Sequence, residues 1–194
     1  MVAIIDYNAG NTQSVIFALQ RLGVEPVLTR DVEQLRQADK VIFPGVGEAS
    51  STMAFLTDLG LHEIIPTLTQ PVLGVCLGMQ LMCEYSDEGN TAGIGIFPHR
   101  ALKFEPEGGL KVPHMGWDNI IRLSGDLFTP EMENDYAYFV HSYYVPLGSD
   151  MAAACDYIMP FSAALQKDNF YGVQFHPEKS GPLGERILKN FLEL

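Results

Sequence analysis

Apolar runs alternate with amphipathic stretches through the first half of the chain. The runs Val2–Asp6 and Val41–Phe43 are almost wholly apolar, which is typical of strands buried on both faces of a sheet. From Thr12 onward the apolar positions recur with helical spacing, and Gly23 fits the end of that helix. This part of the chain therefore predicts a strand, a helix and a further buried strand.

The same alternation continues as far as the middle of the chain. Further elements are predicted as a strand at Glu25–Leu28, a short helix capped by Asp31, helical stretches around 53–56 and 61–65, and a strand entering Cys76. Such a β-α-β-α order favours a parallel sheet with helices on both faces. Function in such sheets collects at the carboxyl ends of the strands, where segments 8–11, 44–47 and Cys76 would fall.

After Glu88 the pattern changes to short strand-like pieces separated by glycine and proline. Strands are predicted at Asn119–Leu123, Tyr136–Val140, Ala152–Tyr157, Ala163–Gln166 and Phe170–Gln174, and an amphipathic helix from about Leu183. No repeat or linker interrupts the chain, so we expect one domain over residues 1–194. The fold class is predicted as α/β, with a mostly parallel central sheet, flanking helices and a β-rich C-terminal half.

Composition narrows the possible partners. The chain has 194 residues, a formal net charge of −12 and three cysteines. The negative charge argues against nucleic acid and against anionic membrane surfaces as partners. No apolar run is long enough for a membrane span, and no export signal is present, so a cytoplasmic protein without disulfides is expected.

The stretch Val72–Gln80 carries the strongest chemical signal. An apolar run leads into Gly-x-Cys-x-Gly and then into residues with helical character, so Cys76 would lie on a strand-turn-helix elbow. Glycines at positions 74 and 78 would let the chain turn sharply and the helix pack closely. A cysteine at a helix N-terminus is also favoured as thiolate. The alternative is a buried cysteine between two incidental glycines.

A second signal follows the last predicted strand. His176 ends an apolar run, and Glu178 lies two residues on, on the same side of an extended chain. Glu178 would then orient the imidazole, and His176 would take the proton of Cys76, as in nucleophile–base–orienter triads. The alternative is a surface histidine that happens to neighbour a glutamate.

The segment Pro44–Gly47 offers a third signal. Acyl transfer needs N–H donors directed at the developing oxyanion, and the amide of Leu77 is one candidate. A glycine-flanked loop such as 44–47 suits a second donor, although a plain turn explains it equally well. No metal site or cofactor is predicted, because the histidines are scattered and Cys83 and Cys155 lie in apolar runs.

Taken together, the motifs resemble those of a known family. Pro-Gly-Val-Gly, Gly-Val-Cys-Leu-Gly-Met-Gln and Gly-Val-Gln-Phe-His-Pro-Glu-Lys-Ser occur in the order seen in class I glutamine amidotransferases. Segments 6–11, 113–117 and 139–143 narrow the resemblance to the glutaminase subunits of imidazole glycerol phosphate synthases. One departure is Asp118, where asparagine is more usual.

This resemblance implies a reaction and its residues. Cys76 attacks the side-chain amide carbon of L-glutamine, His176 protonates the departing ammonia and then activates water, and Glu178 orients His176. Backbone amides of Val46 and Leu77 would hold the oxyanion. The residues implied to hold the glutamine are Gly47, Gln80, Glu88, Ser142 and Tyr143.

The resemblance also implies a partner. Ammonia would pass to a (β/α)8-barrel cyclase subunit, which converts a ribulosyl phosphate to imidazole glycerol phosphate and an aminoimidazole carboxamide ribotide. Asn8, Asn11, Trp117 and Lys179 would face that subunit. Little activity is expected without it, and the glycine loop at 45–47 is a reasonable place for the switch.

Three alternatives remain open. A glutaminase of the same fold serves pyridoxal phosphate synthase, but typically carries a Gly-Gly-Glu-Ser-type loop and lacks His-Met-Gly-Trp. A cysteine hydrolase of another kind usually lacks the C-terminal His-x-Glu. A silent binding subunit would have no need of Cys76, His176 and Glu178 together.

Overall fold

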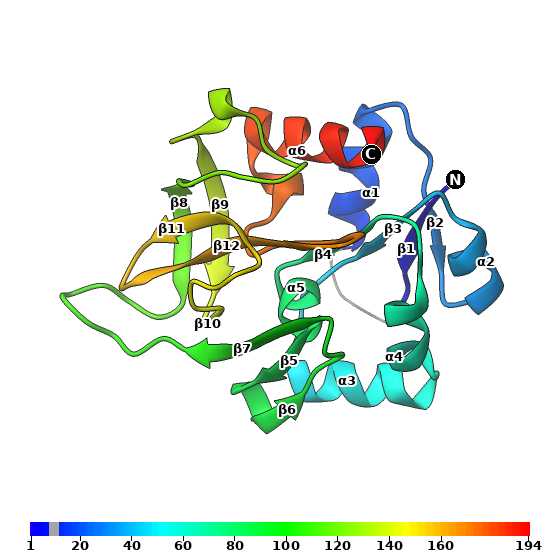
Figure 1. Ribbon diagram of the computed structural model, residues 1–194, viewed down its shortest axis with the longest axis horizontal. Helices are drawn as coiled ribbons and strands as arrows, with labels where there is room; N and C mark the ends of the chain where they lie inside the picture. The colour runs from blue at the N-terminus through cyan, green and yellow to red at the C-terminus, as the bar shows by residue number, and fades with distance from the viewer. Residues whose placement is uncertain (8–11) are drawn as a thin grey trace.

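The computed structural model describes residues 1–7 and 12–194, with helices and strands alternating first and strands dominating later (Figure 1). The helices are α1 (Thr12–Arg21), α2 (Val32–Gln37), α3 (Ala49–Asp58), α4 (Leu61–Ile64), α5 (Leu77–Leu81) and α6 (Gly181–Glu193). The strands are β1 (Val2–Ile5), β2 (Val27–Thr29), β3 (Lys40–Phe43), β4 (Val72–Val75), β5 (Cys83–Ser86), β6 (Thr91–Ala92), β7 (Phe97–Lys103), β8 (His114–Asn119), β9 (Tyr136–His141), β10 (Tyr143–Tyr144), β11 (Met151–Asp156), β12 (Pro160–Lys167) and β13 (Phe170–Val173).

A central sheet organises these elements. Its strands lie in the order β11-β12-β13-β4-β3-β1-β2. Neighbours from β2 to β13 pair in parallel, whereas β12 and β11 add antiparallel pairs at one edge. The predicted mostly parallel sheet is therefore confirmed. Because β4 and β13 are parallel neighbours, the residues that follow them emerge at the same edge of the sheet.

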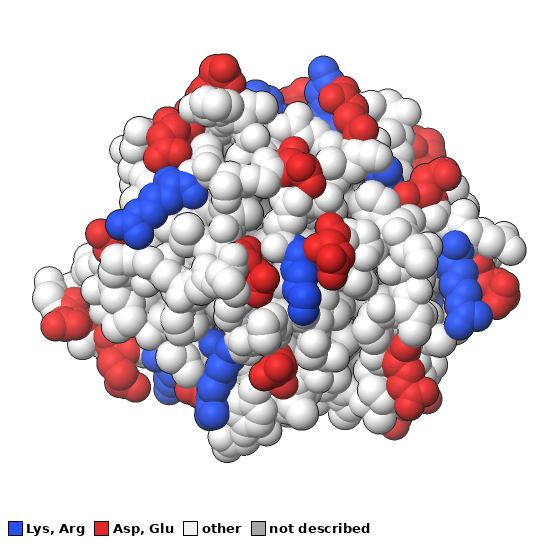
Figure 2. Space-filling model, viewed as in Figure 1, with Lys and Arg blue, Asp and Glu red and all other residues white. Residues whose placement is uncertain are grey.

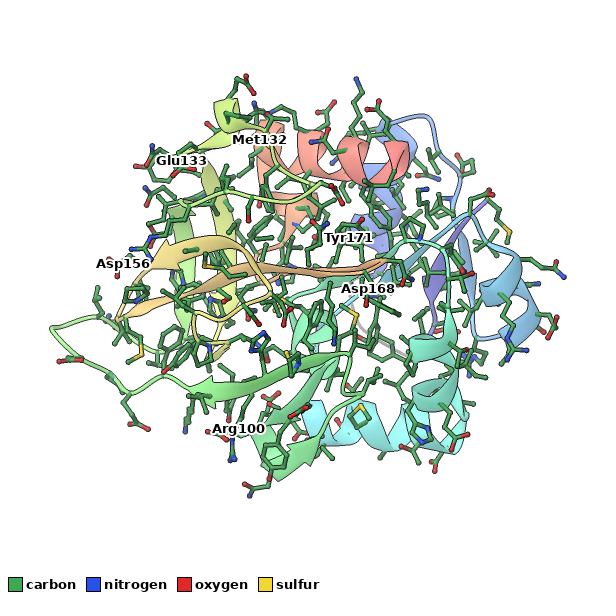
Figure 3. All side chains as sticks on the ribbon, in the orientation of Figure 1. Arg100, Met132, Glu133, Asp156, Asp168 and Tyr171 are labelled. Atoms are coloured by element: carbon green, nitrogen blue, oxygen red, sulfur yellow. The ribbon has the colours of Figure 1, made fainter. Side chains whose placement is uncertain are left out.

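Helices cover both faces of this sheet, as predicted. Figure 1 places α1 and α6 on one face and α3, α4 and α5 on the other. Alternate residues of β1 serve the two faces: Val2 and Ile4 join one buried apolar cluster, and Ala3 and Ile5 join the other. In Figure 3, Tyr171 lies between the sheet and α6, where its ring contacts Phe191. Two-sided burial thus explains the continuous apolar runs in the sequence.

Two smaller sheets complete the β-rich second half. One has the order β10-β7-β5-β6, and the other is the antiparallel pair β8-β9. In the β8-β9 pair, His114 is opposite His141 and Asn119 is opposite Tyr136. Strands β6 and β7 were expected only as short strand-like pieces, because Pro98 and the glycines nearby obscure their pattern, and β5 and β10 were not predicted.

Two predicted strands are wrong in position. The structure ends β8 at Asn119, where the predicted strand Asn119–Leu123 begins, and Arg122 has a left-handed φ of 56°. Pairing with β9 sets the end of β8, because Asn119 pairs with Tyr136, the first residue of β9, and the chain turns after it. The predicted strand at Glu25–Leu28 is shifted, since β2 pairs with β1 through Val27–Thr29.

Several local predictions hold. The side chain of Asp31 caps α2 by accepting a hydrogen bond of 2.9 Å from the Gln34 amide. Gly23 follows α1 with a φ of 79°, as a helix stop requires.

Lysine and arginine side chains lie next to acidic ones on the face drawn in Figure 2.

Among the described residues, none of the helices combines the length and apolar character needed to cross a membrane.

Candidate active site at the end of the central sheet

Cys76 occupies a strained turn between β4 and α5. Its backbone has φ 51° and ψ −108°, a combination that a non-glycine residue rarely adopts. The Cys76 amide donates a 2.7 Å hydrogen bond to the Val173 carbonyl, which ties the turn to β13. The thiol therefore sits at the first turn of a helix, at the carboxyl end of a central strand.

Glycines on both sides of Cys76 allow this turn to pack tightly. A Cβ at Gly78 would lie 2.1 Å from the Phe43 carbonyl oxygen, and one at Gly74 would lie 2.8 Å from the Met79 amide. Gly45 is equally close, since its Cβ would lie 2.2 Å from the Gly78 amide nitrogen. Backbone atoms thus fill the space where any larger residue would go, and the loop 44–47 lies directly against the elbow.

His176 and Glu178 form a buried pair beside β13. The His176 Nδ1 lies 2.9 Å from Glu178 Oε1, and both side chains are only 2 % exposed. The link between them differs from the expected extended chain, because Pro177–Lys179 forms a 3-10 turn. Pro177 begins that turn, and the turn folds the carboxylate back onto the ring.

The imidazole of His176 is held between two acceptors. Burial lowers the pKa of His176, but hydrogen bonds to Cys76 and Glu178, together with attraction to both, raise it to about 10. At neutral pH the imidazolium form is therefore favoured. A protonated ring beside Cys76 is the arrangement that stabilises a thiolate.

A pocket of about 250 Å³ opens directly beside Cys76. Its lining comes from five regions of the chain: Gly47, Cys76, Leu77, Gln80, Glu88, Pro113, Val140, His141, Ser142 and Tyr143. The five residues that the family resemblance implies for glutamine binding all belong to this lining. The structure thus brings these residues, from segments far apart in the sequence, together around the thiol.

The two predicted oxyanion donors lie in different surroundings. Leu77 lines the pocket at the start of α5, whereas Val46 is not among the lining residues. The backbone of Val46 instead hydrogen-bonds the Tyr7 hydroxyl, which opposes the rise in the Tyr7 pKa that burial causes. The Tyr7 hydroxyl in turn donates to the Pro44 carbonyl. Tyr7 therefore holds the loop 44–47 at two points, Pro44 and Val46.

Of the four predicted partner-facing residues, the structure describes Trp117 and Lys179, and both contact the Tyr138 ring. Trp117 on β8 is 55 % exposed and meets Tyr138 edge to face. Lys179 lines a separate cavity of about 420 Å³ that also reaches Glu178. Asn8 and Asn11 lie outside the described residues.

Gln174 is a site residue that the sequence reasoning missed. It is fully buried, and its Nε2 lies 3.5 Å from Cys76 Sγ. Its Oε1 accepts a 2.8 Å hydrogen bond from Gln80. Gln174 lies within the motif that contains His176, two residues earlier, but nothing in the pattern showed that its side chain turns toward the thiol.

A buried histidine pair adjoins the pocket. His141 Nδ1 lies 2.7 Å from the Tyr143 carbonyl, and His141 Nε2 lies 3.1 Å from His114 Nδ1. Burial lowers the pKa of His114 to about 4 and of His141 to about 3, so both are neutral at pH 7. In the part of the chain that the structure describes, no group of three or more His, Cys, Asp or Glu side chains could hold a metal ion.

Comparisons with known proteins agree on one family. The model of the class I glutamine amidotransferase family matches residues 3–194. Imidazole glycerol phosphate synthase subunits HisH are similar over the full length: that of Bacteroides fragilis is 60 % identical and that of Bacteroides thetaiotaomicron 57 %, each covering 100 % of this chain and 99 % of the relative. A solved glutamine amidotransferase has the same fold, with a TM-score of 0.77 at 17 % identity over 100 % of this chain and 98 % of its own.

Proposed function

This chain belongs to the class I glutamine amidotransferases and, within them, to the HisH subunits of imidazole glycerol phosphate synthase; from that membership we propose that it releases ammonia from L-glutamine through Cys76, His176 and Glu178. The observation that carries the proposal is the strained Cys76 beside a buried His176–Glu178 pair, at the wall of a pocket of about 250 Å³. As a member of the HisH subunits, the chain acts in histidine biosynthesis.

The first half-reaction follows from these positions. The Cys76 thiolate attacks the amide carbon of glutamine, and the oxyanion forms beside the Leu77 amide at the start of α5. His176, charged at neutral pH, gives its proton to the departing ammonia. A thioester to Cys76 remains, and His176 is now neutral because it has given up its proton.

In the second half-reaction the neutral His176 activates a water molecule. That water attacks the thioester carbon, glutamate leaves, and the proton returns to the imidazole while the thiolate re-forms. Glu178 keeps Nδ1 engaged at 2.9 Å throughout, so Nε2 is the nitrogen that exchanges the proton. The substrate would be held by Gly47, Gln80, Glu88, Ser142 and Tyr143, which line the pocket.

The name of the HisH relatives implies a second subunit. The proposed partner is a (β/α)8-barrel cyclase that receives the ammonia and converts a ribulosyl phosphate to imidazole glycerol phosphate and an aminoimidazole carboxamide ribotide. Trp117 and Lys179, which are both exposed, are proposed to face it. Asn8 and Asn11 keep the same proposed role, although they lie outside the described residues.

Glutamate release from glutamine tests the proposal directly. The rate is measured for the chain alone and with the cyclase and its ribulosyl phosphate. Low activity alone and strong activation in the liganded complex would support the synthase-subunit assignment. Full activity that does not depend on the cyclase would assign the chain to another pathway. The absence of activity in both states would favour a silent subunit.

A variant pair tests the nucleophile. Labelling by a glutamine-analogue electrophile should vanish in Cys76→Ser and persist in Cys83→Ser. Cys83 is a suitable control because it is fully buried, and burial raises the pKa of its thiol. Persistent labelling in Cys76→Ser would refute the triad.

A further inference from the structure

Three buried groups form a hydrogen-bonded relay that ends on the nucleophile. Gln80 Nε2 donates 2.9 Å to the Tyr143 carbonyl and 2.8 Å to Gln174 Oε1. Gln174 Nε2 then donates to Cys76 Sγ at 3.5 Å. Gln174 is 0 % exposed and Gln80 is 4 % exposed, so water does not compete for these bonds.

The backbone carbonyl of Tyr143 determines the direction of this relay. A carbonyl oxygen only accepts, so the end of the Gln80 amide that faces it must be the NH2 group. That same NH2 group reaches Gln174, which must therefore present its oxygen to Gln80. The NH2 group of Gln174 is then left to face the sulfur of Cys76.

The sulfur has a choice of neighbours that depends on its charge. As a thiol it can donate to the Val140 carbonyl, 3.8 Å away. As a thiolate it can only accept, and Gln174 supplies an N–H at 3.5 Å. A donor that is oriented before the reaction stabilises the charged sulfur and leaves the neutral one unaided.

We infer that Gln174 is a dedicated hydrogen-bond donor to the Cys76 thiolate, and that Gln80 is the positioning residue that holds it in place. The inference rests on the proposed role of Cys76 as nucleophile. Gln80 also lines the glutamine pocket. A substrate that contacts Gln80 would therefore act on the side chain that positions the Gln174 amide beside the sulfur.

The test is the pH profile of Cys76 alkylation by iodoacetamide in the full chain, followed by mass spectrometry of the Cys76 peptide. Gln174→Met keeps the length of the side chain and removes its amide. The midpoint of the profile should rise by about one pH unit, the equivalent of one charge-assisted hydrogen bond. Glutaminase kcat/KM at pH 7, measured with the cyclase and its ligand, should fall about tenfold with little change in KM.

A matched control makes the same Gln→Met substitution away from the thiol. Gln166 lies on the neighbouring strand β12, and its amide bonds Asp126 rather than Cys76. Gln166→Met should leave the alkylation midpoint at the wild-type value. The titratable groups around Cys76 are His176, Glu178, Tyr7, His141, Glu88 and Tyr143, and neither substitution replaces any of them.

Two results would overturn the inference. The first is an unchanged midpoint in folded Gln174→Met. If that variant does not melt cooperatively, Gln174→Glu takes its place, because it keeps the shape but turns an oxygen toward the sulfur, and an unchanged midpoint there is equally decisive. Glutaminase activity that survives in Cys76→Ser would instead refute the proposed function, so the two failures are distinguishable.

Discussion

The His176 Nδ1 and the Glu178 Oε1 lie 2.9 Å apart in surroundings that leave each side chain only 2 % exposed. Glu178 Oε2 has no hydrogen-bond partner among the described residues, so the imidazole is the main contact of this carboxylate. A single buried acceptor thus sets which nitrogen of His176 faces Cys76.

Glu178→Gln should slow glutamine hydrolysis by about 10²–10⁴-fold, because an amide can donate to Nδ1 and so stabilise the wrong tautomer. KM should change little, since Glu178 does not line the glutamine pocket. Steady-state kinetics in the liganded complex measure both values. Glu185→Gln, an exposed change on α6, should keep the wild-type rate, and a wild-type rate in Glu178→Gln would remove Glu178 from the triad.

Tyr7→Phe should raise the glutaminase rate of the chain without its partner. The Tyr7 hydroxyl bonds both Pro44 and Val46, and so keeps the second candidate oxyanion donor away from the pocket. A missing donor slows acyl transfer by about 10²–10³-fold, which is the upper limit of the expected gain. The ratio of partner-activated to basal rate should therefore shrink.

The control for Tyr7 is Tyr171→Phe, which removes a hydroxyl that bonds Asp126 on the far side of the sheet. This variant should keep both rates. Gly47→Pro offers an independent check, because proline cannot adopt the φ of 128° at Gly47, so the loop would be fixed in another conformation and activation by the partner should also flatten. Undiminished activation in both Tyr7→Phe and Gly47→Pro would argue against the loop as the switch.

Gly78→Ala should destabilise the fold by about 1–3 kcal/mol and abolish most activity, as overpacking does elsewhere. Its Cβ would lie 2.1 Å from the Phe43 carbonyl oxygen, so β3 and α5 would have to separate. Urea denaturation of the chain measures the loss. Gly108→Asn is the control, since that glycine has open space and a positive φ that asparagine tolerates.

The sequence predicted the central sheet well because its strands are buried on both faces. Runs such as Val2–Asp6 and Val41–Phe43 are almost wholly apolar, so their pattern indicates a strand that is buried on both faces. The β8 strand escaped prediction because it contains Gly116 and because its register depends on β9, far along the chain. That residues 1–194 form one domain stays a prediction.

The site was predictable where a motif and a strand end coincide, as at Cys76 and His176. It was not predictable where a side chain acts through a neighbour from another segment. Gln174 reaches Cys76 only because β13 lies beside β4, and Tyr7 reaches Val46 only because β1 lies beside β3. Such contacts depend on sheet order, which local patterns do not encode.

Acidification should destabilise the protein through His114 and His141. Their folded pKa values of about 4 and about 3 lie below the ordinary 6.5, so the unfolded chain binds more protons below pH 6.5. Stability is therefore present above pH 6.5 and is lost as pH falls. The raised pKa of His176 acts in the opposite sense, but only above pH 6.5, where stability falls toward pH 10.

Urea unfolding at pH 6.5 and pH 5.5 measures this loss, which should reach about 1–2 kcal/mol for two histidines over the interval. The range stops at pH 5.5 because burial also raises the pKa of Asp118 and Glu88, which favours the folded state at lower pH. His141→Gln removes one of the two groups and should roughly halve the slope. His62→Gln is the control, because His62 lies on α4 and contacts neither His114 nor His141. An equal slope in the wild type and in His141→Gln would show that the buried pair is not what acid disrupts.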